Sequence, residues 1–392
     1  MSSDALSAWK ARLHQGLCEL EERSQRRSLE EIRGIDFCSN DYLGLAENSV
    51  LRERVVEAVR KTEKVGGTGS RLLSGQTEEW RELEENFAKF AGTEAALFFT
   101  TGYAANLGLL SSLVGKDDVV FSDERNHASL IDGMRLSGAR KVIYPHLNLN
   151  ALEDALRQEA GAPCRRIVVT ESVFSMDGDI APLPEIANLA EKYNAVVILD
   201  EAHATAVHGP EGRGLAAAAG LTRRFLAIVH TCGKALASAG AFVCGSAALK
   251  EHLLNHARTF VFSTALPSYF AAQIQAALEL AEGMDEERKT LLERASRFRA
   301  ALQAEGLDVA GSGSQIVPVI LGQNDATLDA AEHLQREGFA VRGIRPPTVP
   351  EGKARLRLSL TTRIAVEELV RFTDALRAWR SRQTSLASAR HA

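Results

Sequence analysis

Short apolar runs alternate with amphipathic helical patterns from about residue 50 onward. Each run is bounded by polar residues or glycine, which is typical of strands buried on both faces of a parallel sheet. The runs are Ala95–Phe99, Val119–Phe121, Lys141–Tyr144, Ile167–Thr170, Val196–Leu199, Leu226–Val229 and Ala241–Cys244. The pattern predicts an α/β fold with a mostly parallel seven-stranded sheet.

The pattern differs on either side of this layer. An amphipathic helix over residues 4–25 and a short strand at Gly34–Ser39 form an N-terminal arm. A long helical stretch from Leu266 to Glu305 is expected to bridge two lobes. After it come strands Val317–Leu321, Ala340–Ile344 and Leu356–Leu360, and helices Ala326–Glu337 and Val366–Arg382. We therefore expect an arm and small-domain segment (1–49), a large domain (50–280) and a smaller α+β C-terminal domain (281–392).

Composition excludes several classes of protein. With 46 basic and 51 acidic residues among 392, the net charge is −5, so nucleic-acid or anionic-membrane binding is not expected. The least polar uncharged stretch, Ala235–Leu249, is shorter than the ~20 residues of a membrane helix. The first 16 residues lack the apolar core of a signal peptide. Five cysteines without a CxxC pair favour reduced thiols, no metal site and a cytoplasmic location.

Three polar features follow predicted strands, at the sheet edge where open α/β folds bind ligands. Asp200 and His203 come directly after one strand. Lys234 follows another and enters a neutral segment, so it is a candidate for a lowered pKa and a Schiff base. Gly102 and Tyr103 open a helix whose free N–H groups favour a phosphate.

Each feature also has a plain structural interpretation. Most lysines are solvated, most lone histidines are satisfied structural groups, and a glycine such as Gly102 is often only a turn residue. The segment Asp200–His203 also matches the acidic motif of nucleic-acid-dependent ATPases. That function needs a phosphate loop, yet every Gly-Lys pair here is followed by Asp or Ala. The Gly-rich segment Gly66–Arg71 lacks the third glycine of a dinucleotide fingerprint, so a Rossmann cofactor is not expected.

A phosphate site, a strand-end carboxylate and a lysine on a neighbouring strand together describe a site for pyridoxal 5'-phosphate. Here the sequence resembles the α-oxoamine synthases, a fold-type-I pyridoxal-phosphate family with the aspartate-aminotransferase-like fold. The resemblance covers nearly the whole chain. The segments that carry it are Ser39–Leu45, Gly66–Gly75, Asn126–Leu130, Glu171–Asp179, Asp200–Gly209, Thr231–Lys234 and Arg345–Pro350.

The resemblance implies a role for each matching residue. Lys234 would hold the cofactor as a Schiff base and then act as the base at Cα. Asp200 would pair with the ring nitrogen, His203 would bind the phenolic oxygen, and His127 would stack on the ring, so that these four residues form the catalytic set. The implied cofactor site comprises Gly102, Tyr103, His127, Ser175, Asp200, His203, Thr231 and Lys234, with Ser263 or Thr264 of a second subunit of a homodimer.

The segment from Arg345 to Pro350, followed by Ala354–Leu358, most resembles the family branch that joins L-alanine to a pimeloyl thioester, carried on coenzyme A or an acyl carrier protein, in biotin biosynthesis. By that resemblance, Arg345 and Asn40 would bind the amino-acid carboxylate, and His127 and Thr348 would contact substrate. Arg23 would bind the distal carboxylate of the acyl chain. Glycine C-acetyltransferase, 5-aminolevulinate synthase and serine palmitoyltransferase remain alternatives within the family, and an aminotransferase of the same fold remains one outside it.

Overall fold

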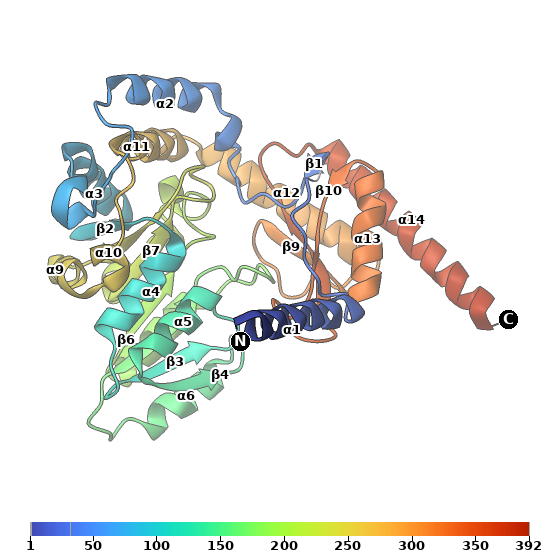
Figure 1. The fold of residues 1–392 in the computed structure, drawn as a ribbon, viewed down its shortest axis with the longest axis horizontal. Helices are drawn as coiled ribbons and strands as arrows, with labels where there is room; N and C mark the ends of the chain where they lie inside the picture. Colours follow the sequence, from blue (N-terminus) through green and yellow to red (C-terminus); the bar gives the residue numbers. More distant parts are fainter. Residues whose placement is uncertain (1, 32, 392) are drawn as a thin grey trace.

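The central sheet has seven strands in the order β2-β8-β7-β6-β5-β3-β4 (Figure 1). The computed structural model describes residues 2–31 and 33–391, with side chains for residues 4–31 and 33–385. The strands are β2 (Ala95–Phe99), β3 (Val119–Asp123), β4 (Arg140–Tyr144), β5 (Arg166–Glu171), β6 (Ala195–Asp200), β7 (Ala227–Thr231) and β8 (Ala241–Gly245). Only β8 runs antiparallel to its neighbours in this sheet. The predicted fold class is confirmed.

Alternate side chains of these strands face two apolar layers, because successive residues of a strand point to opposite faces. Val120, Val169 and Ile198 pack under the helices of one layer, whereas Val168 and Val197 face the other. The first layer contains α4 (Gly102–Leu113), α5 (Ala128–Ser137), α9 (Ala247–His256) and α10 (Arg258–Val261), and the second contains α6 (Leu149–Gln158) and α7 (Leu183–Lys192). We call this body the large lobe.

A second body, the small lobe, is built on the antiparallel sheet β11-β12-β9. The predicted strand Ala340–Ile344 is wrong as one element, because it forms two short strands. The first of them, β10, pairs with β1 of the N-terminal arm. The small-lobe strands are β1 (Ile35–Asp36), β9 (Ile316–Gly322), β10 (Phe339–Ala340), β11 (Gly343–Ile344) and β12 (Ala354–Ser359), and its outer helices are α13 (Asn324–Arg336) and α14 (Val366–His391).

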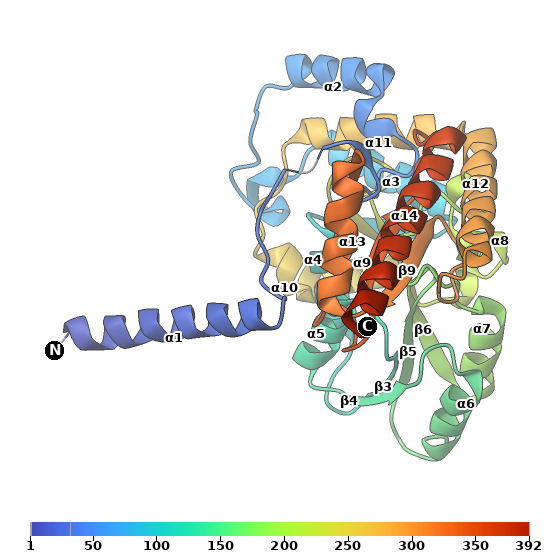
Figure 2. The same ribbon diagram turned by 90° about the vertical axis from the view of Figure 1, so that its right-hand side faces the viewer.

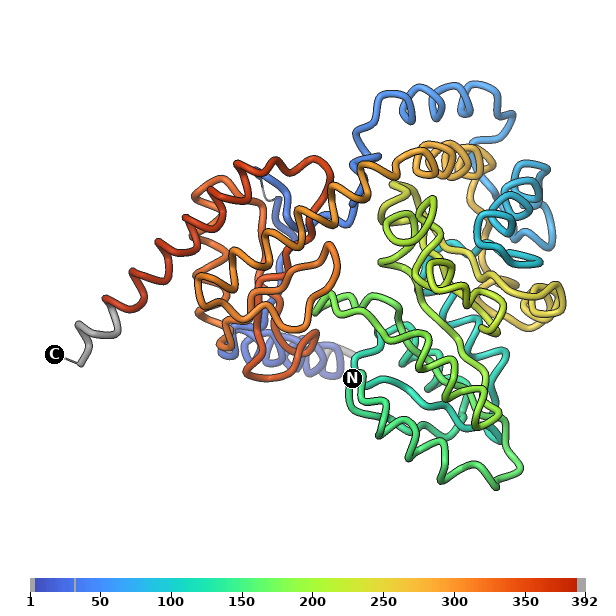
Figure 3. Tube along the Cα trace, turned by 180° about the vertical axis from the view of Figure 1, so that it is seen from behind, coloured from blue at the N-terminus to red at the C-terminus, as the bar shows by residue number. Residues whose placement is uncertain are grey.

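The helical stretch predicted over residues 266–305 consists of two helices. The first, α11 (Ser268–Glu282), ends at Gly283, and α12 (Asp285–Ala304) begins two residues later. Three acidic residues in the first turn of α12 favour a new helix start, because they complement the positive end of its dipole. Figures 1 and 3 show α11 against the large lobe and α12 against the small lobe, so the break lies where the chain passes between them.

Of the remaining helices, α3 (Glu78–Ala91) packs against β2 and β8 and is largely buried on that side. Figure 2 shows α1 projecting from the body of the molecule, while α2 and α3 lie beside α11. These helices are α1 (Ser2–Glu22), α2 (Ser49–Lys61), α3 (Glu78–Ala91) and the single turn α8 (Leu215–Ala218). Within the described residues, every helix is too short or too polar to cross a bilayer.

Candidate active site

A cavity of about 190 Å³ lies at the carboxyl ends of the parallel strands. Glu171 is the last residue of β5, Asp200 is the last of β6, and Lys234 follows β7 by three residues. All three line this cavity, and Glu171 and Asp200 are directly opposite each other in the strand register. The cavity therefore gathers titratable groups on rigid backbone at the edge where open α/β sheets bind ligands.

Lys234 is half-buried, and its Nζ lies 2.9 Å from Nε2 of His203. Burial lowers the pKa of Lys234 to about 8, although the carboxyl groups of Asp200 and Glu171 act in the opposite direction. An amine with this pKa is partly neutral near pH 8 and can act as a nucleophile, unlike a fully solvated lysine.

The ring of His203 is held from the side opposite Lys234. Its Nδ1 lies 2.7 Å from the hydroxyl group of Tyr42, which in turn donates to Oδ1 of Asn40 at 3.0 Å. Burial, followed by the nearby charge of Lys234, lowers the pKa of His203 well below its ordinary value. The imidazole is therefore neutral and has one N–H, so Tyr42 and Lys234 together determine which ring nitrogen carries it.

Asp200 is oriented by two donors. Asn106 Nδ2 donates to its Oδ2 at 2.6 Å, and the backbone N–H of Ala202 donates to Oδ1 at 2.8 Å. Asn106 also donates to Ser129 Oγ at 2.9 Å, and that hydroxyl lies 2.8 Å from Nδ1 of His127. The carboxylate and the His127 ring are therefore linked through the facing helices α4 and α5.

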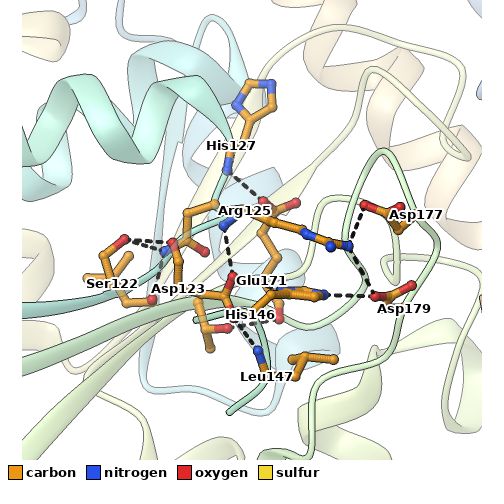
Figure 4. A network of polar contacts seen from close by, with 12 residues as sticks. Ser122, Asp123, Arg125, His127, His146, Leu147, Glu171, Asp177 and Asp179 are labelled. Atoms are coloured by element: carbon orange, nitrogen blue, oxygen red, sulfur yellow. Dashed lines mark hydrogen bonds and ion pairs between the residues drawn. The ribbon is translucent and has the colours of Figure 1, made fainter. Parts of the chain in front are cut away.

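Glu171 is a site residue to which the sequence analysis assigned no role. Its Oε1 accepts the backbone N–H of His127 at 2.6 Å (Figure 4). Burial, and then the negative charge of Asp200, raise the pKa of Glu171 to about 8. At neutral pH Glu171 is therefore mainly a carboxylic acid. Its position directly at the end of a strand was the signal that could have identified it.

The start of α4 closes one end of the cavity. Thr101 caps this helix by accepting the N–H of Ala104, and Gly102 and Tyr103 form its first turn. Thr231 lines the same cavity, and a Cβ built on Gly102 would lie 3.5 Å from its Oγ1. The free N–H groups of a first turn beside a hydroxyl group suit a phosphate.

The two conspicuous arginines of the small lobe have different surroundings. Arg345 directs its guanidinium at the carbonyl groups of Ser24 and Arg26 in the N-terminal arm. Arg357, in contrast, is buried, and its Nη1 donates to Asn40 Oδ1 at 3.1 Å. Its positive charge is among the causes that lower the pKa of both Lys234 and His203. The structure therefore places Arg357, which the sequence analysis did not select, beside the cavity.

Three other expected site residues do not line the Lys234 cavity. Arg23 is exposed, and its backbone carbonyl accepts a hydrogen bond from Asn324. Thr348 accepts a hydrogen bond from Arg27 and lines a separate cavity of about 600 Å³ together with His127 and Ser175. Thr264 pairs with Ser70 in an isolated β-bridge and does not line the Lys234 cavity of the described chain. The roles assigned to these residues stay predictions.

Comparison with known proteins identifies the family. The family model described as aminotransferase class I and II matches residues 32–372. The chain belongs to this family. Among curated relatives, 8-amino-7-oxononanoate synthase of Geobacter sulfurreducens is 44% identical over 92% of this chain and 95% of its own length. The synthase of the same name from Citrifermentans bemidjiense is 46% identical over 83% of each chain.

Solved structures of family members have the same fold. Serine palmitoyltransferase with pyridoxal phosphate as an internal aldimine is 31% identical, with a TM-score of 0.84 over 88% of this chain and 87% of that one. The 8-amino-7-oxononanoate synthase of Francisella tularensis is 30% identical, with a TM-score of 0.77 over 90% and 99% of the two chains. The chain is accordingly an enzyme of the fold-type-I pyridoxal-phosphate class.

Proposed function

We propose that the chain joins L-alanine to a pimeloyl thioester with loss of CO₂, giving 8-amino-7-oxononanoate in biotin biosynthesis. One observation carries the proposal. The amine of Lys234 shares a cavity with Asp200 and His203 in a chain that is 44% identical, over 92% of its length, to a relative of that name. The acyl carrier, coenzyme A or an acyl carrier protein, is part of the same proposal.

The residues of the cavity fit pyridoxal phosphate. Lys234 would hold it covalently, Asp200 would face its ring nitrogen, and the first turn of α4 with Thr231 would bind its phosphate. Bound there, the cofactor supplies an aldehyde for amines and a protonated ring that withdraws electrons from the amino-acid Cα. Glu171, being mainly uncharged at neutral pH, would not compete with the carboxyl group of Asp200 for that ring nitrogen.

Lys234 also supplies the base. Its pKa of about 8 makes the free amine available at Nζ near neutral pH, and His203 orients that atom through a 2.9 Å contact. With alanine bound, Nζ would take the Cα proton. A base tethered beside the substrate reacts faster than a base that must first diffuse in from solvent.

Arg357 is the residue that we propose for the carboxylate of alanine. It is buried, it contacts Asn40, and it lies in the electrostatic field of Lys234 and His203. A planar guanidinium binds a carboxylate through two parallel hydrogen bonds, which fixes the Cα bond to be broken. Arg345, which donates to the Ser24 carbonyl of the N-terminal arm and whose own carbonyl accepts the N–H of Thr348, would then lie on the side of the acyl substrate.

The condensation balances without a further reactant. Cα of alanine forms a bond to the thioester carbonyl carbon, and the C–S bond breaks to release the thiol carrier. The carboxylate then leaves as CO₂, and a proton is returned to Cα. Arg23 for the distal carboxylate, and a homodimer in which Thr264 completes the partner's phosphate site, stay part of the proposal.

The test is a product screen. The purified enzyme is incubated with L-alanine, glycine or L-serine against acetyl, pimeloyl and palmitoyl thioesters, and each product is identified by mass. The expected result is CO₂ release with alanine and the pimeloyl thioester. A preference for glycine and an acetyl thioester, or for serine and a palmitoyl thioester, would assign another branch of the family. Conversion of the cofactor to its amine form without thioester would favour an aminotransferase.

Two matched variant pairs test the assigned residues. Lys234→Ala should abolish covalent cofactor attachment after borohydride reduction, whereas Lys116→Ala, at an exposed lysine, should leave it intact. Arg357→Lys should raise the alanine KM about tenfold or more, because the two-pronged contact is lost, and Arg345→Lys should change it far less. If Arg345→Lys raised the alanine KM more than Arg357→Lys did, Arg345 would be the residue that binds the carboxylate.

A further inference from the structure

A cluster of charged side chains lies next to the turn that runs from Asp123 to His127, which we call the His127 turn, and outside the Lys234 cavity (Figure 4). Its acids are Asp123 at the end of β3 and Asp177 and Asp179 in the turn after β5, all of them buried. Arg125 lies 2.9 Å from Asp177 and 3.8 Å from Asp179, and Arg355 of β12 pairs with Asp177. Three carboxylates thus face two guanidinium groups.

His146 is the remaining member of this cluster. Its Nδ1 lies 2.8 Å from Asp123 Oδ1 and its Nε2 lies 2.8 Å from Asp179 Oδ2. A neutral imidazole has one N–H and would direct a lone pair at one of the two carboxylates. Only the imidazolium donates to both, and its charge would bring the cluster to three positive and three negative groups.

The backbone beside His146 is held in an uncommon conformation. Leu147 has a φ of 54°, in the left-handed region, and its N–H donates to Asp123 Oδ2 at 2.9 Å. Such a conformation in a non-glycine residue persists only where its surroundings enforce it. Asp123 therefore fixes both the ring and the following residue.

The two turns that His146 joins carry residues of the proposed site. Asp123 also accepts the N–H of Arg125 at 2.9 Å, at the beginning of the turn that ends in His127. In the other turn, the carbonyl of Asp179 accepts the N–H of Phe174, next to Ser175. Ser175 in turn accepts a hydrogen bond from Arg357 through its carbonyl group.

We infer that His146, as an imidazolium between Asp123 and Asp179, is a positioning residue that holds the His127 turn and the Ser175 turn in register with Arg355 of the small lobe. This inference rests on the proposed function, because His127, Ser175 and Arg357 matter only if the cofactor and the amino acid bind between these turns. His146 touches neither reactant and acts through these residues.

The titration of His146 supports the geometry. Its burial disfavours the charged form, but Asp123 and Asp179 raise its pKa to about 9 in spite of that burial and of the charge of Arg125. Asp177 and Arg355 complete the cluster but do not contact His146. Arg355 pairs with Asp177, and Arg125 contacts both Asp177 and Asp179. Deprotonation of His146 above pH 9 should therefore break one of its two hydrogen bonds to Asp123 and Asp179.

The experiment compares His146→Gln, the double variant His146→Gln/Asp179→Asn, and His256→Gln as a control at an exposed histidine. Each holoenzyme is assayed for pyridoxal-phosphate affinity and for kcat and KM between pH 6 and 10. His146→Gln should weaken cofactor affinity and kcat by about 10- to 100-fold at pH 7, as loss of a positioning contact does. The double variant should regain at least tenfold in cofactor affinity and kcat over His146→Gln, because the cluster then holds two carboxylates and two guanidinium groups.

Two further readouts separate this inference from the proposed function. In histidine-labelled wild type, the His146 nitrogens should give imidazolium shifts up to about pH 9, assigned by their absence in His146→Gln. The wild type should also lose cofactor affinity above that pH, a change that His146→Gln should lack. Any of three results would overturn the inference: a neutral His146 at pH 7, a His146→Gln enzyme with the same cofactor affinity and kcat as His256→Gln, or a double variant with lower cofactor affinity and kcat than His146→Gln. Failure of the wild type to use alanine and a pimeloyl thioester would count against the proposed function alone.

Discussion

Replacing Glu171 with Gln isolates one proton in the active-site cavity. Glu171 is 3% exposed, lies opposite Asp200 and accepts the N–H of His127 through Oε1. Gln has the same shape, keeps that acceptor and cannot ionise. It therefore reproduces the neutral acid that we infer for the resting protein, and Glu171→Gln should differ from the wild type only where the wild type loses this proton.

The magnitude follows from the raised pKa. A change from 4.5 to about 8 corresponds to at most roughly 5 kcal/mol of preference for the neutral form in the folded state. Because part of this pKa shift comes from the nearby charge of Asp200, the measurable effect is smaller, about 2–5 kcal/mol. The sign is fixed by linkage: the folded state binds this proton between pH 4.5 and 8 and the unfolded chain does not, so wild-type stability falls as pH rises through that interval.

The assay is denaturant or thermal unfolding of the apoprotein at pH 5, 6, 7 and 8. Wild type and Glu171→Gln should be nearly equal at pH 5, and the variant should become progressively more stable toward pH 8. For a chain of this length the difference at pH 8 is about 2–6 °C in Tm. The control Glu185→Gln, at an exposed carboxylate, should show no pH-dependent difference. A variant less stable than wild type at pH 8, or a difference independent of pH, would refute the assignment.

Two further substitutions test how the cavity and the lobes are held. Tyr42→Phe leaves Nδ1 of His203 without its 2.7 Å partner. This should lower the free energy of unfolding by about 1–3 kcal/mol and change the pH at which the bound cofactor alters its absorbance. If both values are unchanged, Tyr42 has no role in the site. Gly178→Ala places a Cβ at 2.2 Å from the carbonyl oxygen of Ile316, at a φ of +71°, and should cost about 2 kcal/mol or more, whereas Gly161→Ala, with open space around it, should be nearly neutral in the same unfolding measurement.

Much of the large lobe could be predicted because its strands are buried on both faces. Such strands are continuous apolar runs in the sequence, and their ends are marked by polar residues. Lys234, Asp200 and His203 could be predicted for the same reason, since each lies in the short segment that follows a run. The break at Gly283 was missed, because helical periodicity continues on both sides of it and only the cap and the acidic first turn mark the boundary.

Contacts that depend on how distant segments pack could not be predicted in this way. Tyr42 and His203 are 161 residues apart, and no local pattern connects them. The role of Glu171 had a local signal, since it ends a strand as Asp200 does, but its protonation depends on the register that places the two carboxyl groups opposite each other. Register is a property of the assembled sheet.

The choice between Arg345 and Arg357 shows what a small-lobe strand can reveal. In β12, Leu356 and Leu358 belong to the apolar core, so the alternation predicts that Arg355 and Arg357 face away from it. Arginines on the outer face of a small antiparallel sheet are ordinarily exposed, yet these two are 3% and 8% exposed. They are buried because the large lobe covers this face and supplies partners there, Asp177 for Arg355 and the Ser175 carbonyl for Arg357. The arginine face of β12 is thus the boundary between the lobes, which is why we propose Arg357, rather than Arg345, for the carboxylate of alanine.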